Sequence, residues 1–149
     1  MKVFIGADHA GFELKERLKS SLPLFKGELE GETPFIVDLG PTSLIPDDDY
    51  PAIAKAVAEA IAKEPGSVGI LSCANAVGVC VVANKTPGIR AGVGFSIEAA
   101  RTMRSDDDAN ILCIPGRIPI MDDAVEIAKT FLQTKFSNEE RHKRRIAHI

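Results

Sequence analysis

Short apolar runs alternate with helical stretches along the chain, and this alternation limits the possible folds more than any other feature. The runs predicted as strands are Lys2 to Ala7, Phe35 to Gly40, Val68 to Cys73, Arg90 to Phe95 and Asn110 to Ile114. Helices are predicted over Gly11 to Ser21, Tyr50 to Lys63, Ala76 to Asn84, Ile97 to Arg104, Met121 to Gln133 and Glu139 to Ala147. Apolar strands that alternate with helices are typical of a parallel sheet covered on both faces. Right-handed crossovers then predict an α/β fold, a Rossmann-like, doubly wound, five-stranded parallel sheet with helices on both faces.

The length of 149 residues suits one domain with a substantial core, so we expect a single domain over residues 1–149. The sequence contains no internal repeat and no low-complexity tract. The stretch from Leu22 to Thr33 contains Pro23, Gly27 and Gly31, and it is predicted to be a long loop before the second strand.

Composition and charge narrow the functional classes. No apolar run approaches the roughly 20 residues that span a bilayer, and Asp8 and His9 come too early for the apolar core of a signal peptide. We therefore expect a cytoplasmic protein without a membrane partner. A net charge of -3 argues against nucleic acid as the main partner. Cys73, Cys80 and Cys113 lack CxxC spacing, which argues against a disulfide framework and a structural zinc site.

In an open parallel sheet, ligands bind beyond the carboxyl ends of the strands, so the residues that follow each strand are the first candidates. Asp8 and His9 follow the first strand and precede a helix, whose free N–H groups favour an anion. His9 could contact a phosphate, and Asp8 could hold a sugar hydroxyl. Asp8 could equally do no more than cap the helix. Arg117, directly after the last strand, is a further candidate for binding phosphate.

Cys73 lies where the third strand gives way to a helix, and the turn Ala74-Asn75-Ala76-Val77-Gly78 follows it. The helix dipole stabilises a thiolate at this position, and the N–H groups of the turn could bind a developing oxyanion. A base and oxyanion donors on one short turn are what proton removal beside a carbonyl group requires. The alternative is a small buried apolar side chain, which is the interpretation we favour for Cys80 and Cys113.

A basic segment, Arg141-His142-Lys143-Arg144-Arg145, lies near the C-terminus. Arg141 and Arg145 are four residues apart and would share one face of a helix. Two guanidinium groups placed in this way can hold a phosphate by bidentate hydrogen bonds. The segment could instead be a solvated basic face that complements the negative end of the helix dipole.

Five stretches resemble, in order along nearly the whole chain, the family of ribose-5-phosphate isomerase B and the galactose-6-phosphate isomerase subunits. They are Gly6 to Gly11, Asp49 to Pro51, Ala83 to Ala91, Asp108 to Leu112 and Arg141 to Arg145. The resemblance implies aldose–ketose isomerisation of a phosphorylated sugar through an enediolate, with neither a metal nor a cofactor. Ribose 5-phosphate and ribulose 5-phosphate are the default pair. The resemblance also implies a homodimer, or a dimer of dimers, with active sites between subunits that the C-terminal helix reaches.

The same resemblance implies roles for individual residues. Cys73 falls on the family's base, which moves a proton between C2 and C1 of the sugar. The family's phosphate ligands fall on His9, Arg117, Arg141 and Arg145, with the last two coming from the neighbouring subunit. Sugar contacts are expected from Asp8, Tyr50, Asn110 and the turn Ala74, Asn75, Ala76, Val77 and Gly78.

Two departures from the family pattern bear on the activity. The family usually has Gly-Thr-Gly after the cysteine, and the methyl groups of Ala74 and Ala76 narrow the pocket or restrict the backbone. The family also usually has a histidine that opens the cyclic sugar where this chain has Asp106, the candidate catalytic residue at that position. An ionised aspartate has no proton to donate, so this departure affects ring opening and leaves the enediolate chemistry intact.

Several alternatives therefore stay open. The substrate could be another sugar phosphate, such as a tetrose 4-phosphate or a hexose 6-phosphate. The protein could be a non-catalytic sugar-phosphate-binding homologue. It could also be a subunit whose related partner supplies the missing histidine.

Overall fold

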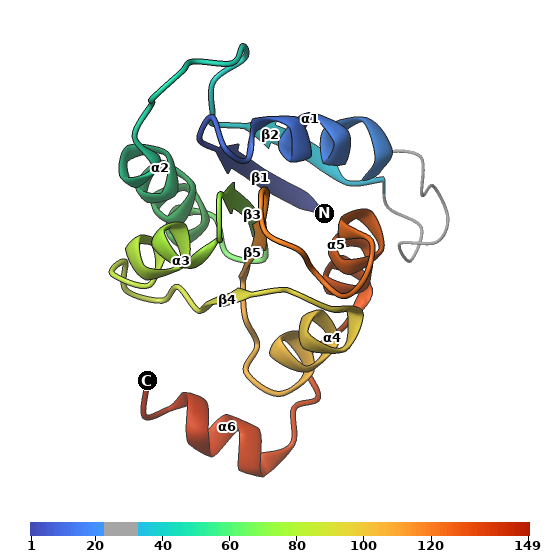
Figure 1. Cartoon of the computed structure of the whole chain (residues 1–149). Coiled ribbons are helices and arrows are strands. Elements are labelled where there is room, and N and C mark those ends of the chain that lie inside the picture. Colours follow the sequence, from blue (N-terminus) through green and yellow to red (C-terminus); the bar gives the residue numbers. More distant parts are fainter. Residues whose placement is uncertain (23–32) are drawn as a thin grey trace.

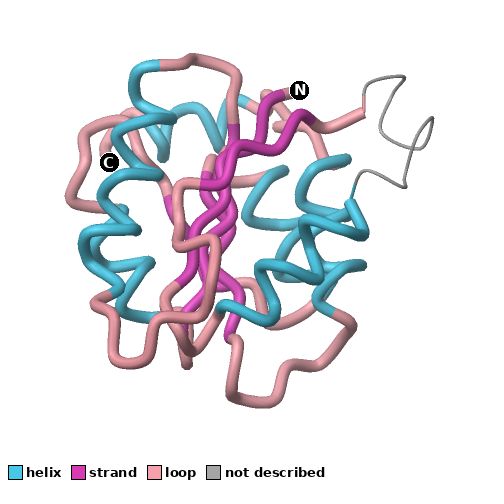
Figure 2. The backbone as a smooth tube through the Cα atoms, turned by 90° about the horizontal axis from the view of Figure 1, so that it is seen from above, coloured by secondary structure: helices cyan, strands magenta, loops and turns pink. Residues whose placement is uncertain are grey.

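Five parallel strands form one sheet, in the order β2-β1-β3-β5-β4, in the computed structural model, which describes residues 1–22 and 33–149. The strands are β1 Lys2–Ala7, β2 Phe35–Asp38, β3 Val68–Cys73, β4 Ala91–Val93 and β5 Ile111–Pro115. The helices are α1 Phe12–Ser21, α2 Tyr50–Lys63, α3 Val77–Ala83, α4 Ile97–Ser105, α5 Ala124–Gln133 and α6 Glu140–Ile146. Figures 1 and 2 show the sheet between two layers of helices, which confirms the predicted fold class. The loop predicted over residues 22–33 lies almost entirely outside the described residues.

The predicted elements are all present, and the differences lie at their ends. β4 starts one residue later than expected, because the N–H of Arg90 bonds to the side chain of Asn110 at 2.9 Å instead of to a neighbouring strand, and it ends at Val93, before the predicted Phe95. α5 begins later than expected, because Asp123 caps its first turn by accepting a hydrogen bond from the Val125 N–H at 2.9 Å. The start of β4 and the start of α5 are therefore fixed by side-chain hydrogen bonds rather than by the hydrophobic pattern.

The core is divided into two layers, because successive side chains of a strand point to opposite faces of the sheet. Val3 and Ile5 of β1 are buried on the face covered by α1, α4 and α5. Phe4, between them, is buried on the face covered by α2 and α3. Cys73, at the end of β3, belongs to this second layer, so its side chain points toward α2 and α3.

The strand order predicts a ligand-binding position near the centre of the sheet. From β1 the chain passes to β2 on one side, and it then returns to build β3, β5 and β4 on the other side. A reversal of this kind separates the connections that leave neighbouring strands and opens a crevice beyond their carboxyl ends. Here the reversal lies between β1 and β3, the strands that end just before Asp8 and at Cys73.

Candidate active site

The ends of the three central strands, β1, β3 and β5, meet at one edge of the sheet. The carbonyl oxygen of Cys73 accepts the Gly116 N–H at 2.9 Å, and that of Ala74 accepts the Arg117 N–H at 3.0 Å. A Cβ atom at Gly116 would lie 2.5 Å from the carbonyl oxygen of Ala10, so the turn after β5 also touches the turn after β1. The candidate residues that follow these three strands therefore collect at one place.

A cleft of about 410 Å³ opens at this edge, between the turns after β1 and β5 and the loop before α2. It is lined by His9, Ala10, Glu13, Leu44, Pro46, Asp47, Gly116 and Arg117. His9 and Arg117, both predicted phosphate ligands, thus face the same cleft. Glu13 and Asp47 bring two carboxylates to the same lining, and their negative charge opposes the binding of an anion there.

The turn after Cys73 has a strained backbone at Ala76, one of its two alanines. Cys73 itself is only 4% exposed. Ala76, the residue before α3, has φ 64°, in the left-handed region that costs an L-residue about 1–2 kcal/mol and costs glycine almost nothing. Asn75 Oδ1 accepts the Val77 N–H at 3.0 Å, which occupies one of the N–H groups expected to face the substrate.

Tyr50, the first residue of α2, reaches the same turn from the other side. A Cβ atom at Gly78 would lie between 2.6 and 2.9 Å from the ring and hydroxyl of Tyr50, so the ring packs directly on this glycine. Any side chain at this position would displace the ring of Tyr50. Tyr50 and the turn after Cys73, both predicted to contact the sugar, therefore lie next to each other.

The two polar residues after β1 are held in different ways. Asp8 is 6% exposed, and its Oδ1 accepts the N–H groups of Ala10 at 2.9 Å and Gly11 at 3.1 Å, so that oxygen caps the turn. His9 is bonded to Asp48, whose Oδ1 lies 2.7 Å from the His9 main-chain N and 3.0 Å from the ring Nδ1. Asp48 is not among the site residues that the sequence predicts. No local signal marks it, because it lies among three consecutive aspartates and its partner is 39 residues away.

Four other predicted site residues lie at the opposite end of the molecule from Cys73. Asp106 follows α4 and Asn110 precedes β5, which places Asn110 at the amino edge of the sheet. Arg141 and Arg145 belong to α6, which stands apart from the sheet, below α4 in Figure 1. A single chain therefore divides the predicted residues into two groups, one at each end.

Within the second group, a buried histidine joins Asp106 to α6. His142 is 2% exposed, and its Nδ1 forms a 2.7 Å hydrogen bond with Ser137 Oγ. Its Nε2 lies 4.0 Å from Asp106 Oδ2, and Ser105 Oγ donates to the other carboxylate oxygen at 2.5 Å. The Ser137 N–H donates to the Ser105 carbonyl oxygen at 2.9 Å, which ties the segment before α6 to the end of α4, so Asp106 and the arginines of α6 are held at the same end of the molecule.

The side chain of Asn110 forms two hydrogen bonds with the main chain of the turn before β4. Its Oδ1 accepts the Arg90 N–H, and its Nδ2 donates to the Gly88 carbonyl oxygen, each at 2.9 Å. Both polar ends of the side chain thus hold the turn before β4. A sugar contact by Asn110 stays a prediction, and it would have to share these bonds.

The described part of the chain offers neither a metal centre nor a membrane span. No group of three or more His, Cys, Asp or Glu side chains among the described residues could together hold a metal ion. None of the helices that the structure describes is both long enough and apolar enough to cross a bilayer.

Similar proteins extend along almost all of this sequence. The chain is 39% identical to a probable ribose-5-phosphate isomerase B of Mycoplasma pneumoniae, over 99% of this chain and 91% of that protein. It is 37% identical to ribose-5-phosphate isomerase B of Mycobacterium tuberculosis, over 98% of this chain and 86% of that protein.

Solved structures agree with these relatives. The type B ribose 5-phosphate isomerase of Trypanosoma cruzi matches with a TM-score of 0.87 at 38% identity, covering 99% of this chain and 95% of that one. The ribose-5-phosphate isomerase B of Mycoplasma genitalium, solved with bound ribulose-5-phosphate, matches with a TM-score of 0.83 at 35% identity, covering 99% and 92%. The sequence model of the ribose/galactose isomerase family matches residues 3–149, and with these relatives it shows that the chain belongs to that family.

Proposed function

We propose that this protein is an aldose–ketose isomerase of phosphorylated sugars, with ribose 5-phosphate and ribulose 5-phosphate as its default pair. One observation carries the proposal. Cys73 and the residue after it are bonded through the main chain to Gly116 and Arg117, which line a cleft together with His9. The main chain at the candidate base is thus bonded to the turn that carries Arg117, one candidate phosphate ligand, and His9, the other, lines the same cleft. A cytoplasmic location and a place in the pentose phosphate pathway are further expectations of this proposal.

In the proposed reaction, the phosphate lies between His9 and Arg117, and the carbonyl end of the open-chain sugar reaches Cys73. The Cys73 thiolate removes the proton from C2, and the electron pair moves onto the carbonyl oxygen at C1 to give an enediolate. The proton then returns to C1, and a hydroxyl proton passes from O2 to O1, so that the ketose forms with its carbonyl at C2. N–H groups at the start of α3 would stabilise the oxyanion.

We also propose that a second copy of the chain completes the site. Arg141 and Arg145 are exposed on α6, at the end of the molecule away from Cys73. Their charge is what the cleft lacks, because Glu13 and Asp47 oppose an anion there. In a homodimer, α6 of one subunit would bring both arginines to the cleft of the other, and Asp106 would approach with them.

An isomerisation assay with the purified protein on tetrose, pentose and hexose phosphates tests the proposed activity. We expect turnover of at least one of these classes, since Cys73 is retained. Binding of all three without any turnover would contradict the proposal and would favour the non-catalytic sugar-phosphate-binding alternative.

Arg141→Ala is expected to raise KM for the sugar phosphate by roughly 10- to 100-fold, because it removes a charge-assisted hydrogen bond. Among the described residues, the Arg141 side chain bonds to the exposed Glu139 alone, at 2.7 Å, so the fold should tolerate the change. Arg144→Ala is the control, with a smaller expected effect. Equal and small changes in KM at Arg141, Arg144 and Arg145 would support the solvated basic face instead.

Mixing two variants tests whether the arginines come from the other subunit. Cys73→Ala and Arg141→Ala homodimers should both be poorly active at low substrate concentration. After subunit exchange, about a quarter of the sites should be intact, because half of the dimers are mixed and each has one undamaged site. If activity does not recover although exchange is complete, both residues act in the same subunit.

Asp106→His is expected to improve turnover of cyclic sugar phosphates more than that of open-chain ones. A ring-opening acid is needed only for a cyclic substrate, and an aldotetrose 4-phosphate cannot close a five-membered ring because its terminal oxygen is blocked. We expect kcat/KM for ribose 5-phosphate to rise by roughly tenfold or more, within the range of general acid catalysis, and that for tetrose 4-phosphate to change little. Efficient parental turnover of ribose 5-phosphate, with a large loss in Asp106→Asn, would show instead that Asp106 is itself the acid.

A further inference from the structure

The Asp48 side chain is bonded to both the main chain and the ring of His9. One carboxylate oxygen, Oδ1, accepts both the main-chain N–H of His9 at 2.7 Å and a hydrogen bond from the ring Nδ1 at 3.0 Å. The Asp48 side chain is 12% exposed, and its Oδ2 is buried without a hydrogen-bond partner among the described residues. His9 therefore supplies both hydrogen bonds that the structure gives this carboxylate.

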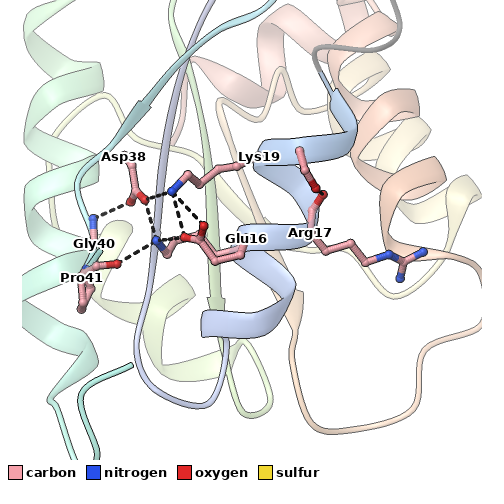
Figure 3. A network of polar contacts seen from close by, with 8 residues as sticks. Glu16, Arg17, Lys19, Asp38, Gly40 and Pro41 are labelled. Carbon is pink, nitrogen blue, oxygen red and sulfur yellow. Dashed lines mark hydrogen bonds and ion pairs between the residues drawn. The ribbon is translucent and has the colours of Figure 1, made fainter. Parts of the chain in front are cut away.

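The loop that carries Asp48 is fastened at its other end as well. Lys15 of α1, which is fully buried, donates from Nζ to the Pro41 carbonyl oxygen at 2.9 Å and to Asp38 at 2.5 Å. Figure 3 shows Asp38, Gly40 and Pro41 gathered against α1 at this point. The loop between β2 and α2 is thus tied to α1 at its beginning and to the turn before α1 at its end, which limits how far Asp48 can move.

The contact determines which nitrogen of the His9 ring is left for a ligand. An ionised carboxylate only accepts hydrogen bonds, so Nδ1 must carry a proton when it bonds to Asp48. Nε2 has no hydrogen-bond partner among the described residues, and His9 lines the same cleft as Arg117. With both nitrogens protonated, the ring would bridge the Asp48 carboxylate on one side and a phosphate on the other.

We propose that Asp48 is a positioning residue that holds the ring of His9 so that Nε2 donates to the substrate phosphate. This inference rests on the proposed function, because it takes His9 to be a phosphate ligand. Asp48 does not touch the substrate itself. Its effect should appear in sugar-phosphate affinity, only through His9, and not in the proton transfer at Cys73.

The test measures KM and kcat for ribose 5-phosphate in Asp48→Ala, Asp48→Asn, His9→Ala and the double variant with alanine at both positions. Asp48→Ala should raise KM by about tenfold, as loss of a charged hydrogen-bond partner does, and should change kcat by less than about twofold. Asp48→Asn keeps an acceptor oxygen and should have a smaller effect. In the His9→Ala background, Asp48→Ala should have no further effect, because the group that it positions is gone.

Asp49→Asn is the matched control. Asp49 is the next residue, is exposed and makes no side-chain capping bond to α2, so its loss of charge should change KM by less than about twofold. Nitrogen NMR of the His9 ring adds a readout that a purely structural role would not move. Nδ1 should carry a proton in the free parent, and both nitrogens should carry one when ribose 5-phosphate is bound, whereas the free Asp48→Ala protein should show a mixture of tautomers.

Three results would overturn the inference: an Asp48→Ala variant with parental KM, an equal rise in KM with and without His9, or a parental His9 ring protonated on Nε2 alone. If Asp48→Ala does not fold, Asp48→Asn provides the same comparison. A parent that binds ribose 5-phosphate without converting it would refute the proposed function, and dissociation constants would then replace KM in the same comparison. If the parent is active and Asp48→Ala leaves KM unchanged, only the inference about Asp48 is refuted.

Discussion

Replacement of Cys73 by alanine is expected to lower kcat by about 10²–10⁴-fold, the usual contribution of a positioned general base. The affinity for the sugar phosphate should stay nearly unchanged, because the candidate phosphate ligands His9 and Arg117 are untouched. Cys73 is 4% exposed in the layer beneath α2 and α3, so the thermal unfolding temperature must be measured beside kcat. A folded Cys73→Ala protein with parental kcat would refute Cys73 as the base.

Cys80→Ala is the control for this substitution, with an expected kcat close to that of the parent. Cys80 is half-buried on α3, and its Sγ lies 3.2 Å from the Ala91 carbonyl oxygen. A hydrogen bond from the Cys113 thiol lowers the pKa of Cys80 to about 7. A thiol-directed reagent would therefore also modify Cys80, and substitution is the cleaner way to test Cys73.

Lys15→Met is expected to lower the free energy of unfolding by about 3 kcal/mol, since it removes one partner of a buried ion pair. All three ammonium hydrogens of Lys15 have acceptors, at 2.5 Å to Asp38 Oδ2, 2.6 Å to Glu16 Oε1 and 2.9 Å to the Pro41 carbonyl oxygen. Methionine fits the space but leaves these oxygens without their donor. Lys19 still bonds to Asp38 at 2.7 Å (Figure 3), and this remaining bond keeps the loss from being larger.

Urea unfolding of the parent and Lys15→Met measures this difference. Lys55→Met is the control, because the Lys55 side chain is 69% exposed and lies 3.7 Å from Glu59 on the same helix. Such an exposed pair contributes about 0.3–0.5 kcal/mol. A loss below about 0.5 kcal/mol in Lys15→Met as well would mean that the buried cluster contributes no more than a surface pair.

The effect of Lys15 should also depend on pH. Burial alone would raise the pKa of Asp38, but hydrogen bonds from Lys15 and Lys19 lower it on balance. A carboxyl with a lowered pKa in the folded state stabilises the fold above the ordinary aspartate pKa of about 4, and this stability is lost as the pH falls through the lowered value. The difference between the parent and Lys15→Met should therefore be fully present near neutral pH and shrink below about pH 4.

The sequence predicted the positions of some residues of the candidate site and not of others. The positions of Cys73, His9 and Arg117 after strands placed them correctly at one edge, because all strands of a parallel sheet end on the same side. The contacts of Asp48 and Lys15 could not be predicted from the sequence. A hydrogen bond between residues 39 apart, or an ion pair between residues 23 apart, leaves no periodic signal in the chain. From sequence alone, a lysine in an amphipathic helix is expected to be exposed to solvent, and only the tertiary structure shows that Lys15 is buried.

The sequence by itself determined the α/β architecture and the limits of β1, β3 and α2, which match the predicted ranges residue for residue. It could do so because apolar continuity and helical period are local properties that each segment carries alone. Only the tertiary structure decided that Arg141 and Arg145 lie far from Cys73, at the end of the molecule that also holds Asp106. The reason is that the position of α6 depends on the burial of His142 and on the hydrogen bond from the Ser137 N–H to the Ser105 carbonyl oxygen, which exist only once α4 and the chain beyond α5 have packed together.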